Sequence, residues 1–135
     1  RGWPVVLVGG ADEPEPELLA EEFGEGVVNV AGELSPLESA ELLSHAAQVI
    51  CNDTAIAHLA EAMETPALVL FGPTVREFGY APSLPGSQLL ETELALPCRS
   101  CSKDGRGLCR NANTLQCLTS IPPEQVLRHV PDFPE

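Results

Sequence analysis

The chain has few aromatic residues and little positive charge. Phe, Trp and Tyr make up 4% of its 135 residues, so the hydrophobic core must be built mainly from aliphatic side chains. Only 7 residues are Lys or Arg, against 20 Asp or Glu, which gives a formal net charge of −13. Nonspecific nucleic-acid binding depends on basic patches, so this charge balance argues against a nucleic-acid partner.

Long apolar runs and two familiar glycine motifs are also absent. No apolar run approaches the roughly 18 residues that suggest a membrane span, and no signal-peptide pattern opens the chain. We therefore expect a cytoplasmic protein without a membrane span. The three-glycine spacing of dinucleotide-binding folds is missing, which excludes a nicotinamide cofactor. The absence of Gly-x-Ser-x-Gly excludes a serine-hydrolase nucleophile elbow.

The chain instead alternates between strand-like and helix-like segments. Strands are predicted by short apolar runs over residues 5–8, 27–30, 49–51 and 67–71. Helices are predicted by apolar spacing over residues 15–23, from 36 onward and over 55–63. This alternation predicts an α/β fold, with a Rossmann-like parallel sheet covered by helices on both faces. The length is that of one domain, which we expect to span residues 1–135.

The regular alternation stops after Phe71. Residues 72–120 are rich in Pro, Gly, Ser and Cys, with a short strand predicted near 87–90 and a last helix over 124–130. The clearest helix start is Ser35-Pro36-Leu37-Glu38. Ser35 is expected as the N-cap, Pro36 at the first helical position and Glu38 as the partner that completes a capping box.

The most informative motif joins the third predicted strand to the third predicted helix. Asp53 and Thr54 lie where that helix starts, and His58 follows Thr54 by one helical turn, on the same face. A helix that begins at the end of a buried strand directs free amides and a positive dipole end at the crevice above the sheet. We interpret the cluster as an anion-binding site. The alternative is that Asp53 caps the helix and His58 packs on it.

Two further strand ends carry candidate site residues. Gly9 and Gly10 follow the first strand and allow close approach of a ligand, and Asp12 could hold a ribose hydroxyl pair. Thr74 follows the fourth strand after Gly72-Pro73, in a loop expected to face the same crevice as Asp53. The alternative in both places is an ordinary strand-terminating turn.

Four cysteines form a C-x2-C-x7-C-x7-C pattern within the Cys-rich loop 98–117. They are Cys98, Cys101, Cys109 and Cys117. Four thiolates can hold a tetrahedral zinc ion, and the first pair has a favoured ligand spacing, so a structural zinc site ranks first. Reduced thiols rank second and disulfides third, and an iron–sulfur cluster is a further reading. The remaining cysteine, Cys51, ends a strand and is expected to be a small buried hydrophobe.

The same loop concentrates positive charge. Four of the seven basic residues lie in it, namely Arg99, Lys103, Arg106 and Arg110. They are either ordinary solvated surface charges or a basic loop beside an anionic ligand, and the sequence favours neither reading.

Taken together, these motifs resemble the carboxyl-terminal half of glycosyltransferase family 9, the ADP-heptose:lipopolysaccharide heptosyltransferase group. The resemblance covers nearly the whole chain. It rests on Val8-Gly9-Gly10, Val30-Ala31-Gly32, the segment 52–60, the segment 65–74 and the four-cysteine loop followed by 121–126. It implies the donor-binding, Rossmann-like half of a two-domain GT-B fold.

The resemblance also implies roles for particular residues. The amides of Thr54 and Ala55 and the side chain of His58 would meet the diphosphate of a nucleotide-sugar donor, with His58 as the catalytic residue. The expected donor-binding residues are Gly9, Gly10, Asp12, Asp53, Thr54, Ala55, His58 and Thr74. Ala55 stands where the family usually has glycine. A glycine lets its amide approach a phosphate most closely, so Ala55 would hold the phosphate less closely.

The implied reaction is transfer of a sugar, with heptose expected, from an ADP-heptose-like donor to a lipid-linked lipopolysaccharide core acceptor. No cofactor or divalent metal is required for it. The acceptor would be bound by an amino-terminal domain that this sequence lacks, so we expect a fragment that is inactive alone. Such an enzyme works in the cytoplasm or peripherally at the inner membrane face. The alternatives are a non-catalytic nucleotide-binding module and a small metal-stabilised structural domain.

Overall fold

The computed structural model describes residues 2–132. Residue 1 and residues 133–135 of the predicted domain lie outside the described part. The chain divides into two compact units, one formed by the residues up to Leu42 together with Asp132, the other by Leu43–Pro131. Each unit is described by itself.

The first unit contains a small parallel sheet and a helix. Strand β1 (Val5–Leu7) pairs with β2 (Val27–Asn29) in parallel, with Val5 opposite Val27. Helix α1 (Glu15–Phe23) connects them and contacts β2. A two-stranded pairing of this length is marginal by itself, so α1 and the turns around it must contribute to the stability of the unit.

Helix α2 (Pro36–Ser44) begins in the first unit as the sequence predicts. The amide of Ser35 donates to the Glu38 carboxylate over 2.8 Å, and the amide of Glu38 donates to the Ser35 hydroxyl over 3.4 Å. This is the reciprocal arrangement of a capping box, so that prediction is confirmed. The carboxylate accepts hydrogen bonds in its charged form, which lowers the pKa of Glu38.

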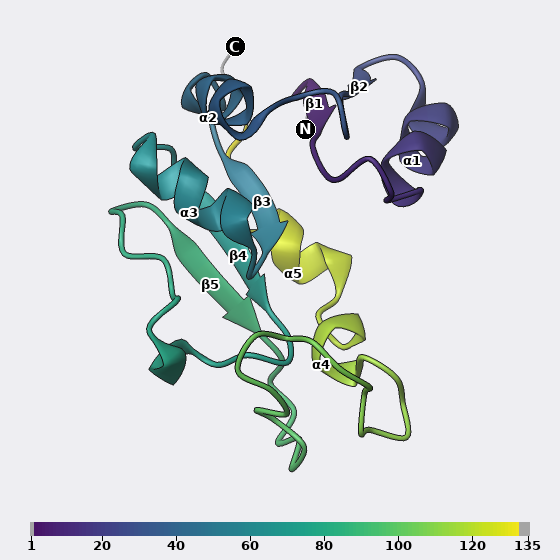
Figure 1. Cartoon of the computed structure of the whole chain (residues 1–135), viewed down its shortest axis with the longest axis vertical. Coiled ribbons are helices and arrows are strands. Elements are labelled where there is room, and N and C mark those ends of the chain that lie inside the picture. Colours follow the sequence, from purple (N-terminus) through teal and green to yellow (C-terminus); the bar gives the residue numbers. More distant parts are fainter. Residues whose placement is uncertain (1, 133–135) are drawn as a thin grey trace. The chain divides into compact units, whose positions relative to one another are not determined.

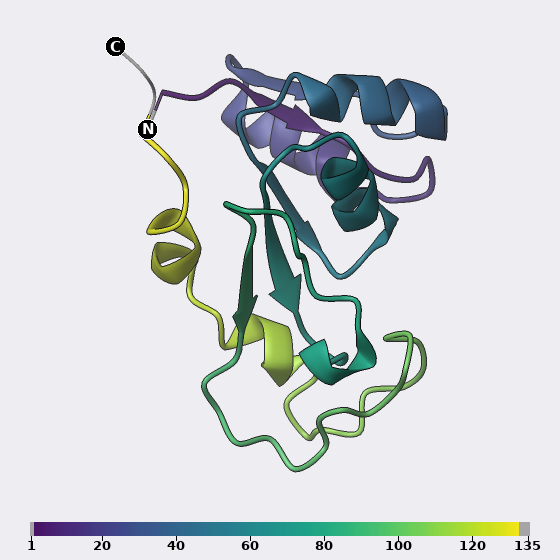
Figure 2. The same ribbon diagram turned by 90° about the vertical axis from the view of Figure 1, so that its left-hand side faces the viewer.

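The second unit is a three-stranded parallel sheet with helices on both faces. Its elements are β3 (Val49–Asn52), α3 (Ala55–Ala62), β4 (Ala67–Phe71), the 3₁₀ turn η1 (Arg76–Phe78), β5 (Gln88–Glu91), α4 (Gln116–Thr119) and α5 (Pro123–Leu127). The strand order is β3-β4-β5, and both pairings are parallel. Helix α3 lies on one face of the sheet, and α4 and α5 lie on the other (Figures 1 and 2).

The predicted α/β fold with parallel strands is confirmed. Within residues 2–132 the strands form two sheets, one in each unit, and no helix there is long and apolar enough to cross a membrane. The last helix is shorter than expected and starts at Pro123. The short helix α4 was not predicted, because its four residues lie in a segment whose polar composition hides any helical period.

The core of the second unit is aliphatic, as the scarcity of aromatic residues requires. The central strand β4 is fully buried at Ala67, Leu68, Val69 and Phe71. Ala57 and Ala60 of α3 are buried as well and belong to the same cluster of apolar side chains. Small alanines on the inner face of α3 let its backbone approach β4 closely, so the helix start is held firmly against the sheet.

One carboxylate fastens the loop after η1 to α3. Glu61 accepts hydrogen bonds from the amide of Ser83 and, over 2.7 Å, from the amide of Leu84. The Ser83 hydroxyl donates to the same oxygen over 3.3 Å. The hydrogen bonds from Leu84 and Ser83 favour the charged form and lower the pKa of Glu61. The exposed side of α3 therefore has a fixed neighbour, the loop that carries Tyr80.

We expect Gly32→Ala to destabilise the first unit. Gly32 has φ of +76°, and an added Cβ would lie 2.6 Å from the backbone Cα of Ala11. The left-handed conformation alone costs an L residue about 1–2 kcal/mol, and the close approach adds to this. Gly26→Ala is the matched control, because Gly26 also has positive φ but has no neighbour within 4 Å of an added Cβ. Urea unfolding of both variants would measure the difference, and equal losses would contradict the close approach.

We expect the stability contributed by Glu61 to depend on pH. Because the folded-state pKa of Glu61 is lowered, the contribution is fully present above the ordinary pKa of a Glu side chain. It is lost as the pH falls through the lowered folded value. The difference in free energy of unfolding between the wild type and Glu61→Gln should therefore be larger at neutral pH than in acid. Glu22→Gln on α1 makes the same chemical change at an exposed position. A pH-independent difference for Glu61→Gln would contradict the expectation.

Candidate functional site

The carboxyl ends of three parallel strands define the candidate site. Asn52 of β3 lies opposite Leu70 of β4, and Phe71 of β4 lies opposite Glu91 of β5. Because the strands are parallel, the residues that follow them leave the sheet at one edge. The prediction that the loop of Thr74 and the helix start at Asp53 share an edge is therefore confirmed. Glu91, which was not predicted, lies at the same edge.

The first turn of α3 is not capped by a side chain. Thr54 occupies the N-cap position with an extended backbone, φ −141° and ψ 174°, but makes no side-chain capping hydrogen bond. The alternative interpretation, in which the Asp53 side chain caps the helix, is therefore not seen. Thr54 and Ala55 are exposed, and Asp53 is half-buried. A helix start without a side-chain cap leaves its amides available to water or to an anion.

His58 lies one turn into α3 and is exposed. Its ring meets Tyr80 edge to face, with centroids 6.3 Å apart and planes at 70°. Tyr80 belongs to the loop that Glu61 holds through Ser83 and Leu84. The imidazole thus has an aromatic neighbour on one side and remains open to solvent, so it can hydrogen-bond a ligand near the helix start.

Thr74 is placed at the predicted edge, but its side chain is buried. Only 3% of it is exposed, and its hydroxyl oxygen has no hydrogen-bond partner. A ligand would reach this hydroxyl only after the loop moved. Of residues 72–74, only Pro73 is half-buried, and Gly72 and Thr74 are both buried.

The Gly72–Thr74 loop is held by Arg99 from the Cys-rich segment. The Arg99 guanidinium donates to the carbonyl of Gly72 over 2.8 Å and to the carbonyl of Thr74 over 3.1 Å. It also pairs with the Glu91 carboxylate at 2.5 Å. The Arg99 side chain is only 13% exposed, so this is a partly buried and well-oriented ion pair. One side chain therefore joins the ends of β4 and β5 to the Cys-rich loop.

Sequence reasoning missed this role of Arg99 and grouped it with the other cations of its loop. Its partners in the loop after β4 are backbone carbonyls 25 and 27 residues away. A contact with a backbone carbonyl cannot be predicted from residue identity, because every residue has a backbone carbonyl. Only the ion pair with Glu91 involves a side chain whose identity could have signalled the contact.

Gly9, Gly10 and Asp12 belong to the first unit and are exposed in it. The carbonyl of Gly9 accepts a 2.9 Å hydrogen bond from the amide of Gly32, which fixes the turn after β1. The Glu13 carboxylate lies against this turn, 2.7 Å from where a Cβ of residue 9 would be. Whether these residues share a ligand with Asp53 stays a prediction.

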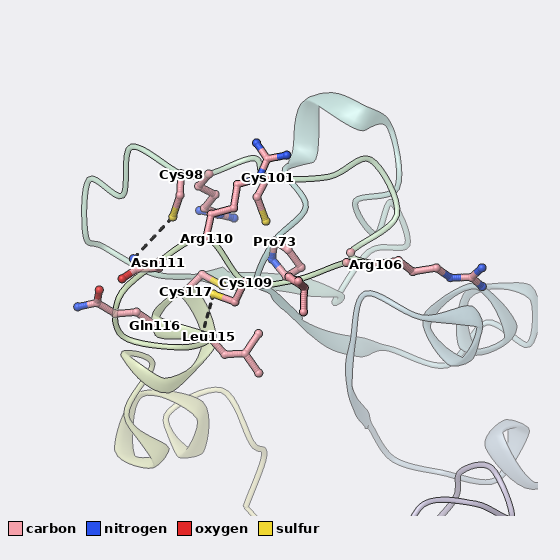
Figure 3. Close-up of a pocket in the computed structure, with 14 residues that line it drawn as sticks. Pro73, Cys98, Cys101, Arg106, Cys109, Arg110, Asn111, Leu115, Gln116 and Cys117 are labelled. Carbon is pink, nitrogen blue, oxygen red and sulfur yellow. Dashed lines mark hydrogen bonds between the residues drawn. The ribbon is translucent and has the colours of Figure 1, made fainter.

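The four cysteines of the Cys-rich loop line one pocket of about 300 Å³. Figure 3 shows Cys98, Cys101, Cys109 and Cys117 around it, together with Arg110 and Asn111. All four thiols are free. Within residues 2–132, no three His, Cys, Asp or Glu side chains surround one point closely enough to hold a metal ion. Any metal bound here would have to draw the thiols together.

The five thiols differ in their surroundings. Backbone amides of Leu115 and then Asn111 hydrogen-bond the sulfur of Cys109 and lower its pKa. The pKa of Cys117 is raised by burial and by the neighbouring Cys101 and Cys109. On β3, burial and then the charge of Asp53 raise the pKa of Cys51 to about 11. Cys51 was expected to be buried and is half-buried, and its raised pKa keeps the thiol protonated near neutral pH.

Comparison with known proteins identifies the family. The protein-family sequence model described as glycosyltransferase family 9 (heptosyltransferase) matches residues 1–105. Lipooligosaccharide heptosyltransferase 2 of Haemophilus influenzae is 34% identical over 136 residues, which cover 94% of this chain and 36% of that protein. Lipopolysaccharide heptosyltransferase 3 of Escherichia coli is 37% identical over 79 residues, which cover 55% of this chain and 23% of that protein.

Solved structures of glycosyltransferases share this fold. The ADP-heptose LPS heptosyltransferase II of E. coli matches 95% of this chain with a TM-score of 0.70 and 26% identity, over 35% of its own length. The family 9 glycosyl transferase of Veillonella parvula shares the fold, with a TM-score of 0.73 and 21% identity over 95% of this chain and 35% of its own. The chain spans about a third of the length of such relatives. Its sequence and fold together show that the chain belongs to glycosyltransferase family 9.

Proposed function

We propose that this chain is the donor-binding part of a glycosyltransferase that moves a heptose from an ADP-heptose-like donor to a lipopolysaccharide acceptor. The names of its relatives, heptosyltransferases of lipopolysaccharide and lipooligosaccharide, support the class of reaction. The observation that carries the proposal is the start of α3. It is exposed, has no side-chain cap and has His58 one turn away.

The proposed contribution of the chain to transfer is electrostatic. As the bond between the sugar and the diphosphate breaks, negative charge develops on the diphosphate that leaves. The amides of Thr54 and Ala55 and the dipole of α3 would stabilise this charge, and His58 would donate a hydrogen bond to a phosphate oxygen. The half-buried Asp53 carboxylate lies beside the helix start, which favours a role in orienting the ligand over one in contacting phosphate.

The loop after β4 would form the second wall of the donor site. Its shape depends on Arg99, which holds the carbonyls of Gly72 and Thr74. In this scheme the donor needs no divalent metal. Other parts of the enzyme bind the acceptor at the inner membrane face and supply the group that takes its proton.

We expect His58→Ala to weaken the binding of ADP to the chain by about 10-fold or more. A hydrogen bond to a charged group contributes about 1.5–3 kcal/mol, and 1.4 kcal/mol corresponds to a tenfold change in affinity. His45→Ala is the matched control, because it makes the same change at an exposed residue outside α3. Isothermal titration calorimetry of the wild type and both variants with ADP measures the three affinities. Equal affinities in His58→Ala and wild type would overturn the role of His58.

We expect Arg99→Lys to lower both stability and ADP affinity. A lysine cannot reproduce the fork that reaches two carbonyls and a carboxylate, so a loss of about 1–3 kcal/mol in the free energy of unfolding is expected. Arg106→Lys should change stability by less than about 0.5 kcal/mol, because Arg106 is almost fully exposed. Urea unfolding and ADP titration of both variants provide the measurements. Unchanged stability in Arg99→Lys would show that the guanidinium does not hold the loop.

A further inference from the structure

The Cys-rich loop offers four sulfur ligands but little structure of its own. No helix or strand lies between β5 and α4 in the described chain. Leu108, near its middle, is 95% exposed, and Gly105 and Gly107 have φ of +74° and +110°. Loops longer than about 12–15 residues without regular structure are uncommon in compact domains. Such a segment needs a local constraint, and apolar burial does not supply one here.

The four thiols are placed to provide that constraint together. Cys98, Cys101 and Cys109 belong to the irregular segment before α4, and Cys117 belongs to α4. All four line the same cavity (Figure 3). Cys51 lies on β3 and does not line it. The four cysteines that are close in sequence therefore also lie around one cavity, and the fifth does not.

Hydrogen-bond donors around the sulfurs suit thiolates. The amide of Leu115 donates to Cys109 Sγ over 3.3 Å, and the side-chain amide of Asn111 donates to Cys98 Sγ over 3.6 Å. Such outer donors orient sulfur ligands and stabilise their negative charge when a metal is bound. A loop that merely carried apolar cysteines would not direct N–H groups at two of them.

The charge of the loop fits a metal–thiolate centre. One divalent ion with four thiolates has a net charge of −2, which is unfavourable in a chain whose formal charge is already −13. Residues 98–117 contain four basic side chains against the single acid Asp104. Arg99 and Arg110 themselves line the pocket. Arg99 is already paired with Glu91, so Arg110 and Arg106, which also lines the pocket, would supply the compensating charge.

We propose that Cys98, Cys101, Cys109 and Cys117 bind one zinc ion that closes the Cys-rich loop. Each thiol gives its proton to solvent as the ion binds. The thiols do not yet surround one point, so the ion draws them together. The positive-φ glycines and exposed side chains between the cysteine pairs allow this movement without disturbing the core. Because Pro73 and Arg99 also line the pocket, the ion would fix the loop to the end of β4.

Metal analysis of the purified chain tests the proposal directly. We expect about one zinc ion per chain by inductively coupled plasma mass spectrometry. Zinc content should be lost in Cys98→Ser, Cys101→Ser, Cys109→Ser and Cys117→Ser. It should be retained in Cys51→Ser, which removes a thiol outside the pocket. Cobalt added to the metal-free wild type should give the sulfur-to-metal charge-transfer absorption of a tetrahedral thiolate site.

Three results would overturn the proposal. They are disulfides found by mass spectrometry of the native chain, iron with inorganic sulfide in place of zinc, or four free thiols that fail to bind cobalt or zinc. If a serine variant does not fold, the wild type still decides. Chelation followed by zinc addition should lower and then restore its melting temperature, and an unchanged melting temperature would contradict a structural ion. The outcome is independent of whether the chain binds ADP.

Discussion

The parallel register of β3, β4 and β5 is the constraint on which the candidate site depends. It brings three strand ends to one edge, so the start of α3, the Gly72–Thr74 loop and Glu91 become neighbours although they are far apart in sequence. The register itself is fixed by burial. Every residue of β4 except the half-buried Leu70 is buried, so a shift of the central strand would expose apolar surface or bury polar groups.

Polar contacts then fix the loops that surround the site edge. Glu61 ties the loop that carries Tyr80 to α3, and Arg99 ties the Cys-rich loop to the ends of β4 and β5. Both use backbone groups as partners, so they fix the path of the chain and leave the surrounding side chains free to vary. At Gly72 the packing is also steric, since an added Cβ would lie 2.7 Å from Leu118 Cγ of α4. The site edge is therefore held from both faces of the sheet.

The sequence was sufficient for most of the helices and strands and insufficient for the contacts between them. Apolar runs located β1 to β4, and Ser35 with Glu38 located the start of α2, because these signals act within a few residues. The shared edge of Asp53 and Thr74 followed from the rules of parallel sheets. The burial of Thr74 and the reach of Arg99 could not be predicted, because both depend on long-range packing. Asp53 and Thr54 are residue types that often cap helices, but whether such a side chain turns toward an amide depends on geometry that residue type does not specify.

The uncapped start of α3 has a thermodynamic consequence. A threonine at an N-cap usually contributes about 1 kcal/mol through its side-chain hydrogen bond, and α3 forgoes that contribution. The first turn of α3 is thus less stable than it would be with a hydrogen bond from an amide to the Thr54 hydroxyl. An anion bound by these amides would offset that loss of stability. Ligand binding and helix order become linked quantities, so an occupied site and a well-ordered first turn of α3 favour each other.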